Sequence, residues 1–322
     1  MAASSISNYP AGFASGITIR GMPLAVTHPG KVFWVYNGTA VLPGQRGGSN
    51  GNKGTFNDPF STVDYAIDQC TASRGDIVMV KPGHAETFAA ADGFSLDVIG
   101  VAVVGLGAGT LKPTFTLSAA TSDVNISAAN CSLVNVRFAG SVTDVVRAIQ
   151  VTAIQATIKD IDVLDSGATN EILTVIKATS TVDNNADGIW IEGCRAYGTS
   201  AAILEFFEFN AQINGLVFKD NLIINEGTAA GVAIAGASGK DLLNAYIGYN
   251  KTANKATSGN LFIDSDSSAS TGIAENNLIG HADVTGTHDN GLTGMGLRLF
   301  NNLSVSTASL SGFVLPAIDV DL

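Results

Sequence analysis

Short apolar segments, each interrupted by a polar residue, recur along the chain between residues 133 and 303. Seven copies read LVNVRF, IKDIDV, IEGCRA, FKDNLI, IGYNKT, AENNLI and FNNLSV, beginning at residues 133, 158, 191, 218, 247, 274 and 300. When the copies are aligned, one column holds Val136, Ile161, Cys194, Asn221, Asn250, Asn277 and Asn302, with steps of 25, 33, 27, 29, 27 and 25 residues. A period near 27 residues whose length varies predicts repeated structural units with loops inserted between them.

Each unit is expected to consist of short strands and turns. The copies are rich in Val, Ile and Phe, and Gly, Ser, Ala, Thr, Asn and Asp cluster between them without a convincing amphipathic helix. A unit of this size and composition corresponds to one coil of a parallel β-helix, whose coils stack about 4.8 Å apart. The segments 76–83 and 101–109 fit two earlier coils. We therefore predict an all-β protein in which residues 76–322 form a parallel β-helix of about nine coils.

Stacking would place the four asparagines of the aligned column, Asn221, Asn250, Asn277 and Asn302, directly above one another. Each side-chain amide could then hydrogen-bond to the asparagine of the next coil, which satisfies polar groups that burial would otherwise penalise. We interpret the column as a structural ladder, and a polar binding site is the alternative.

A short helix is expected before the first coil, within residues 56–75. Ser61 or Thr62 can cap it, and Val63, Ala66, Ile67 and Cys70 keep helical spacing. Such a helix would cover the open end of the core, which a terminal repeat needs.

Residues 1–55 differ from the coils and are expected to form an attachment segment. Two strand candidates, 16–26 and 31–41, are joined at a turn over 27–30 and followed by a Gly-rich loop over 43–55, which is either mobile or lies flat against a partner. Phe33 and Trp34 are the candidate apolar anchors of this attachment or oligomerisation element. The alternative is that the strand pair only packs on the first coil.

Composition narrows the possible partners. The net charge of −11, the pI near 4.6 and 17 basic residues that do not cluster along the chain argue against nucleic acid as a partner. Three widely separated cysteines, Cys70, Cys131 and Cys194, indicate buried thiols and not a disulfide framework. Neither a signal peptide nor an apolar stretch long enough to span a membrane is found in the sequence.

The candidate catalytic residues meet a distance criterion only. Glycoside hydrolysis requires two carboxyl groups roughly 5–10 Å apart, and residues i and i+2 on a strand lie about 7 Å apart on one face. Asp160 with Asp162, and Asp264 with Asp266, meet this criterion, whereas Glu205 and Glu208 are expected to flank the buried Phe206, Phe207 and Phe209. Two histidines and two aspartates in a loop, His281, Asp283, His288 and Asp289, lack a fixed metal-binding spacing. We expect no cofactor and no metal.

The segments 54–68 (GTFNDPFSTVDYAID), 75–88 (GDIVMVKPGHAETF) and 100–107 (GVAVVGLG) resemble the entry to right-handed parallel β-helices of the pectin-lyase-like superfamily. The resemblance covers about 55 residues well and implies the fold. The catalytic motifs of polygalacturonase-like and pectate-lyase-like enzymes do not match: the nearest is Gly280-His281-Ala282, and Arg137, Arg147 and Arg195 lack the lyase context. The segment 8–39 is similar to the opening of β-helix proteins encoded with the structural genes of tailed bacteriophages. That likeness implies a capsid-decorating or cement protein, commonly trimeric.

Two functions therefore remain in view. The first is a non-enzymatic structural protein of the virion, a homotrimer bound to capsid protein through its amino-terminal segment. The second is a tailspike-like protein that cleaves or binds host-surface polysaccharide, which would need paired carboxylates and aromatic walls on one face.

Overall fold

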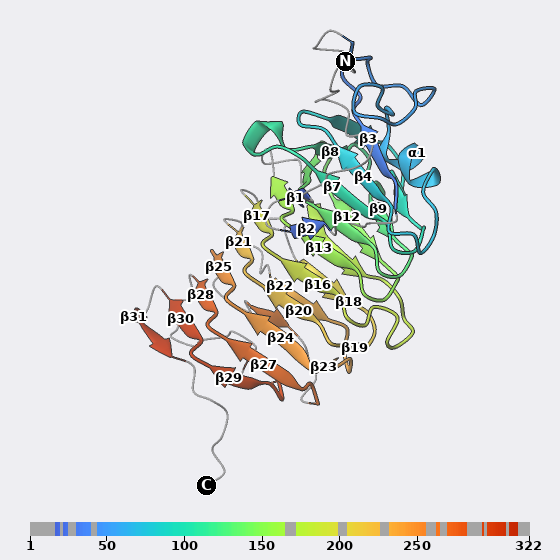
Figure 1. The fold of residues 1–322 in the computed structure, drawn as a ribbon. Helices are drawn as coiled ribbons and strands as arrows, with labels where there is room; N and C mark the ends of the chain where they lie inside the picture. Colours follow the sequence, from blue (N-terminus) through green and yellow to red (C-terminus); the bar gives the residue numbers. More distant parts are fainter. Residues whose placement is uncertain are drawn as a thin grey trace.

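The computed structural model describes residues 17–19, 22–24, 30–39, 44–164, 172–198, 205–225, 232–255, 262–264, 269–281, 292, 295–306 and 309–314. The chain winds into an elongated solenoid whose coils stack from β4 at one end to β29–β31 at the other (Figure 1). It is a right-handed parallel β-helix, as the sequence predicted.

Three long sheets run along the solenoid, and each complete coil contributes one strand to each of them. The first sheet contains, in order, β3 (Val32–Val35), β4 (Ile77–Val80), β7 (Ala102–Gly105), β10 (Ser132–Val134), β13 (Thr157–Lys159), β16 (Trp190–Glu192), β20 (Val217–Lys219), β24 (Ala245–Gly248), β27 (Gly272–Glu275) and β29 (Arg298–Phe300). The second contains β5 (Ala85–Phe88), β8 (Thr114–Leu117), β11 (Arg137–Gly140), β14 (Asp162–Leu164), β17 (Arg195–Gly198), β21 (Leu222–Asn225), β25 (Lys251–Asn254), β28 (Leu278–His281), β30 (Leu303–Ser306) and β31 (Ser309–Val314). The third contains β6 (Ser95–Leu96), β9 (Val124–Ile126), β12 (Val145–Val151), β15 (Ile172–Ala178), β18 (Glu205–Phe209), β22 (Val232–Gly236) and β26 (Ile263–Asp264).

Smaller elements complete the fold. The strands β1 (Ile17–Ile19) and β2 (Met22–Leu24) pair antiparallel, β19 (Ile213–Asn214) pairs with β23 (Leu242–Leu243), and a 3₁₀ turn spans Gly109–Leu111. The last strand of the second sheet, β31, pairs antiparallel with β30, whereas the other pairs of that sheet are parallel.

The solenoid has about seven complete turns, fewer than the nine predicted. Within the described residues, the segments at 274–279 and 300–305 contribute β27–β28 and β29–β30 to the first two sheets, and no strand to the third. The sequence predicted too many coils because each copy of the aligned segment marks only the first two strands of a coil. It does not report whether the third strand is present.

A left-handed backbone residue sits between the first and second strands of successive coils. Seven consecutive rungs carry it immediately before the aligned column, at Asn135, Asp160, Gly193, Asp220, Tyr249, Asn276 and Asn301, with φ between 48° and 68°. Gly, Asn and Asp tolerate this conformation best, which explains why the segments carry these residues there. Tyr249, at φ 59°, is the exception in the series.

Apolar side chains fill the interior of the solenoid in columns along its axis. Phe88, Phe115 and Phe138 occupy successive rungs of the second sheet, with ring centroids 5.5 and 5.8 Å apart, and Phe94 meets Phe115 edge-on at 5.1 Å. Burying one such side chain contributes roughly 1.5–3 kcal/mol. Cys131 and Cys194 are buried, Cys70 is half-buried, and all three are free thiols. Burial raises the pKa of Cys194 to about 12, so this thiol belongs to the core.

The predicted pairing of two amino-terminal strands is wrong. The strand candidate 31–41 contributes β3, which pairs in parallel with β4 and extends the first sheet by one rung. The candidate 16–26 contains both strands of an antiparallel hairpin, β1 and β2, which pair with each other. The described part of the Gly-rich loop is held in place, because Arg46 N–H donates to Asn57 O at 2.8 Å and Gly48 N–H donates to Gly38 O at 3.2 Å.

The helix before the first coil, α1, spans Val63–Asp68, which is shorter than the range 56–75 within which it was expected. Val63, Ala66 and Ile67 face the core, as their spacing predicted. Thr62 is the N-cap residue, but its side chain makes no capping hydrogen bond. Glu86 supplies the acceptor instead: its Oε1 accepts the Val63 N–H at 2.8 Å. The helix is therefore capped from the second sheet and not by its own flanking residue.

Candidate functional site

The four aligned asparagines form a continuous buried ladder between the first and second sheets. Each side-chain Nδ2 donates to the Oδ1 of the next rung, at 3.0 Å for Asn221 to Asn250, 2.9 Å for Asn250 to Asn277 and 2.7 Å for Asn277 to Asn302. The same Oδ1 atoms accept the backbone N–H of the preceding asparagine at 3.1 Å. The four side chains are at most 1% exposed.

The ladder leaves Asn250 no capacity for a ligand. Its Nδ2 donates a second hydrogen bond to Phe218 O at 3.0 Å, so both donors and both acceptor positions are used within the core. Cys194 continues the column through its backbone N–H, which donates to Asn221 Oδ1 at 3.0 Å.

Asp160 and Asp162 do not form the predicted pair on one strand face. Asp160 occupies the left-handed corner between β13 and β14, with φ 54°, so strand spacing does not apply to it. Asp162 lies on β14, where its carboxylate is 3.0 Å from Lys112 Nζ and 3.6 Å from an Arg137 guanidinium nitrogen. These cations neutralise the Asp162 carboxylate and link rungs of the second sheet.

The second predicted pair falls largely outside the described residues. The backbone of Asp264 is in β26, opposite Ala235, whereas the Asp264 side chain and Asp266 are not described.

The carboxylates of Glu205 and Glu208 both approach the hydroxyl of Thr174, a convergence that the sequence does not reveal. Thr174 Oγ1 lies 2.9 Å from Glu205 Oε2 and 3.4 Å from Glu208 Oε2, and Lys177 pairs with Glu208 at 2.7 Å. The intervening Phe206 and Phe207 are both fully buried, so strand alternation breaks between them. As expected, the carboxylates flank buried phenylalanines, but they also converge on one hydroxyl.

An aromatic and charged cluster occupies the outer face of the first sheet over three consecutive rungs. Lys159, Glu192 and Lys219 face one another across β13, β16 and β20, with Nζ to carboxylate distances of 2.7 and 3.1 Å. Trp190 Nε1 donates to Glu192 at 2.7 Å, and the two ammonium groups lie 5.0 and 5.5 Å from the indole centroid. Burial opposes ionisation of Glu192, but the hydrogen bonds from Lys159, Trp190 and Lys219 outweigh it and lower the pKa of Glu192. The cluster presents an indole that is 36% exposed between two cations.

Two tyrosines extend this face toward the later coils. Tyr246 donates its hydroxyl to Glu275 at 2.6 Å, which raises the pKa of Tyr246 to about 12. Tyr249 is 49% exposed at the left-handed corner that follows β24. A bulky residue in this conformation is strained, and strained residues often mark functional positions.

The candidate attachment residues lie on β3 and face opposite sides of the first sheet. Phe33 packs against the core, with its ring 5.9 Å from that of Phe60. Trp34 lies on the outer side and meets Phe56 edge-on at 4.9 Å.

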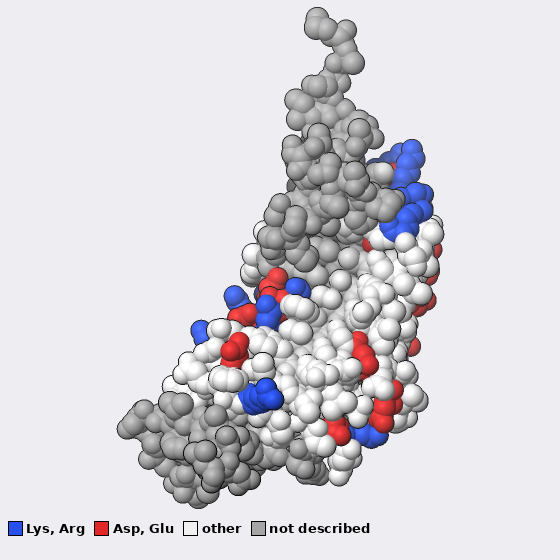
Figure 2. Space-filling view, turned by 60° about the horizontal axis from the view of Figure 1, so that its bottom comes forward, with Lys and Arg blue, Asp and Glu red and all other residues white. Residues whose placement is uncertain are grey.

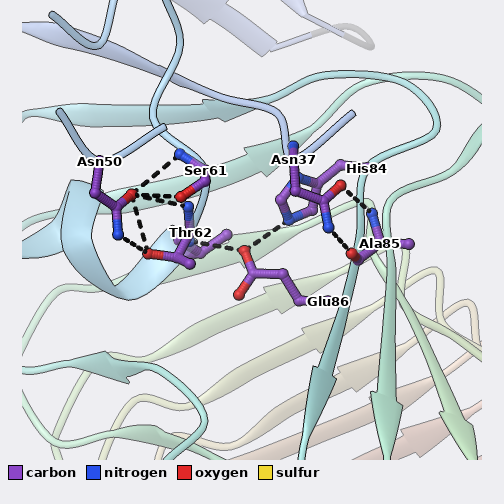
Figure 3. Close-up of polar contacts among 8 residues, drawn as sticks. Asn37, Asn50, Ser61, Thr62, His84, Ala85 and Glu86 are labelled. Atoms are coloured by element: carbon purple, nitrogen blue, oxygen red, sulfur yellow. Dashed lines mark hydrogen bonds and ion pairs between the residues drawn. The ribbon is translucent and has the colours of Figure 1, made fainter. Parts of the chain in front are cut away.

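A polar network joins this end of the molecule to the second sheet (Figure 3). Asn37 N–H donates to His84 Nδ1 at 3.2 Å, so the ring proton lies on Nε2, which donates to Glu86 at 2.7 Å. Asn50 Oδ1 accepts from the Ser61 backbone and hydroxyl at 3.1 and 2.8 Å. Together with the Glu86 cap of α1, these hydrogen bonds join the amino-terminal end of the described chain to the second sheet.

The part of the chain that the structure describes contains no group of three or more His, Cys, Asp or Glu side chains arranged to hold a metal ion. Nor does any described helix have the length and apolarity to cross a membrane.

The sheets and corners define a right-handed parallel β-helix protein. Among solved structures, the chain is similar to a rhamnogalacturonan lyase, with 13% sequence identity and a TM-score of 0.42, over 87% of this chain and 84% of that one. No protein-family model matches the sequence, and a search of curated proteins finds no match.

Proposed function

We propose that the protein is a non-enzymatic structural component of a tailed-phage particle, which attaches through its amino-terminal end and projects its β-helix. The observation that supports this most is how three outer carboxylates of the coils are used. Asp162 is neutralised by Lys112 and Arg137, Glu192 by Lys159 and Lys219, and Glu208 by Lys177. These pairs bridge rungs and stabilise a rod, whereas glycoside hydrolysis needs two carboxyl groups facing a substrate.

In this proposal the protein is a homotrimer in the assembled particle, the state that the resemblance to phage β-helix proteins implies and one that has the closed cyclic symmetry usual for homo-oligomers. The test is cosedimentation of the full chain with capsids stripped of their decoration, together with light scattering of the free protein. Saturable binding and a trimeric mass are expected. A monomer that does not bind capsids would contradict the proposal.

A second candidate function, binding of host-surface polysaccharide, is favoured by the exposed Trp190. Aromatic faces stack on sugar rings, and the strained Tyr249 and the hydroxyl of Tyr246 extend the same face. Titration with host capsule or lipopolysaccharide tests this function. Trp190→Ala should weaken binding at least tenfold, and Tyr197→Ala, an equally exposed aromatic on the second sheet, should not.

Release of oligosaccharides during that incubation would indicate cleavage. It would overturn the non-enzymatic proposal. Loss of that release in Asp162→Asn or in Glu205→Gln would then identify the carboxylates involved.

A further inference from the structure

Charge is divided unequally along this chain. The first 57 residues contain four basic residues and no acidic one, whereas the remaining 265 contain 13 basic and 28 acidic residues. The formal charges are therefore +4 and −15, against −11 for the whole chain. In the view of Figure 2, Lys and Arg side chains gather at one end of the described surface, and both signs are interspersed farther along.

The same end of the chain carries an exposed aromatic group beside its basic residues in the sequence. Phe56 is 44% exposed and rests edge-on against Trp34. Lys53 precedes Gly54, whose carbonyl accepts the Trp34 N–H at 2.8 Å, and Arg46 is tied to Asn57 by a backbone hydrogen bond of the same length. Lys31 directly precedes β3. We name Phe56, Trp34, Lys31, Arg46 and Lys53 the amino-terminal surface.

The cations of the amino-terminal surface are available to a partner. Lys31 and Lys53 are exposed, and the Arg46 side chain is 74% exposed. Arg46 lies 3.8 Å from Asp58, and this ion pair is weak because the distance is long and the Arg46 side chain is exposed to solvent. Lys81 differs because it is buried, and burial lowers its pKa. Its ammonium group lies 4.2 Å from the centroid of the Phe56 ring and donates a hydrogen bond to Phe56 O. Lys81 thus supports the Phe56 ring from below.

The loop that carries most of this surface is held by hydrogen bonds within the chain. Backbone hydrogen bonds tie the loop over 44–58 to β3 and to itself, and Asn52 Nδ2 donates to Gly47 O and Pro59 O at 2.8 Å each. A preordered surface loses less conformational entropy on binding. Tryptophan, tyrosine and arginine are enriched among the residues that dominate binding energy at interfaces.

We infer that the amino-terminal surface docks onto an acidic protein surface, with Phe56 as the apolar anchor and the exposed Lys31, Arg46 and Lys53 of the same end as the cations. This rests on the proposed function, for which it names the chemistry of the partner. The acidic coils would be repelled by the same partner. The molecule therefore approaches an acidic surface with its amino-terminal end first and stands away from it.

The experiment measures binding of the full chain to fluorescent poly-L-glutamate, as a probe of acidic protein surfaces, by anisotropy. Binding is expected at about 20 mM salt and should weaken at least tenfold at about 200 mM, where the Debye length is shorter. Arg46→Glu/Lys53→Glu should lower the affinity at least tenfold, and Phe56→Ala should lower it severalfold. The matched control is Lys251→Glu/Lys255→Glu, which reverses two exposed lysines on the later coils and should leave binding unchanged.

Unfolding curves for each variant separate loss of binding from loss of structure. Equal effects of the two double variants would overturn the inference, because the net charge and not the amino-terminal surface would then govern binding. Tighter binding of duplex DNA or of phosphatidylserine vesicles than of poly-L-glutamate would overturn the assignment of the partner.

The same variants distinguish this inference from the proposed function. Capsid binding that persists in Arg46→Glu/Lys53→Glu would keep the proposed function and reject the inference. Loss of poly-L-glutamate binding in that variant, without any capsid binding by the wild-type protein, would keep the inference and reject the proposed function.

Discussion

The side-chain amide of Asn250 donates to Asn277 Oδ1 at 2.9 Å, and the backbone N–H of Asn250 donates to the same oxygen at 3.1 Å. One oxygen thus serves two donors from the preceding rung, and the arrangement repeats at Asn302. Each asparagine thereby ties the turn of one coil to the turn of the next within the buried interior.

Removal of one ladder residue should destabilise the whole solenoid. Asn250→Ala leaves the Asn221 backbone N–H, the Asn221 amide and the Phe218 carbonyl without their buried partner. Because each unsatisfied buried group costs about 1–3 kcal/mol, we expect a loss of about 3–5 kcal/mol in the free energy of unfolding, measured by urea denaturation. Asn214→Ala, which removes an exposed asparagine contact to Asn244, should cost less than about 1 kcal/mol. Equal effects of the two variants would contradict a buried ladder.

Loss of the Glu86 carboxylate should loosen the helix that precedes the first coil. Glu86→Ala removes the acceptor of the Val63 N–H and of His84 Nε2, and we expect a loss of about 2–4 kcal/mol. Hydrogen exchange should report faster exchange for the amides of Val63–Asp68 than for those of the coils. Asp68→Ala, at an exposed position of the same helix, is the control. Unchanged exchange at Val63 would show that water replaces Glu86 as the cap.

Relief of backbone strain should make one surface substitution stabilising. Tyr249→Asn places a residue suited to φ 59° at the corner where neighbouring rungs use Asp220 and Asn276. Since the left-handed conformation costs about 1–2 kcal/mol for ordinary residues, a gain of up to about 1 kcal/mol is expected in thermal unfolding. Tyr197→Asn, at an exposed strand position with ordinary φ, should not stabilise. A fall in stability for Tyr249→Asn would mean that tyrosine packing outweighs the strain.

Stability should depend on pH through Asp76, which is fully buried. Burial opposes its ionisation, but hydrogen bonds from Arg74 and from the Thr71 and Lys31 backbones outweigh it and lower the pKa of Asp76. A folded-state pKa below the unfolded value near 3.9 stabilises the fold above that pH, and the contribution is lost as pH falls through the folded-state value.

Asp76→Asn should therefore be destabilising by about 2–4 kcal/mol near neutral pH, and the difference from the wild-type protein should shrink as the pH falls below about 4. Denaturation over a pH series measures this convergence. Asp97→Asn, at an exposed position, should run parallel to the wild-type curve. A constant difference for Asp76→Asn would exclude the ionised carboxylate as the source.

The sequence was sufficient to predict the parallel β-helix and the apolar face of α1, because both follow from local periodicity. It could not predict that Glu86 caps α1 from 23 residues away, nor that β3 joins β4, since both depend on tertiary contacts. Asp160 and Asp162 looked like a pair only under strand alternation, and the corner at Asp160 breaks that alternation. The convergence of Glu205 and Glu208 was hidden for the same reason, because Phe206 and Phe207 are both buried.

The antiparallel strand β31 has a consequence for self-assembly. A parallel sheet that ended at β30 would present free backbone donors and acceptors to the first strand of another copy, and copies could then polymerise end to end. β31 pairs with β30 in the opposite direction and occupies that edge of the second sheet. Fibre growth by addition of parallel strands to β30 is therefore blocked.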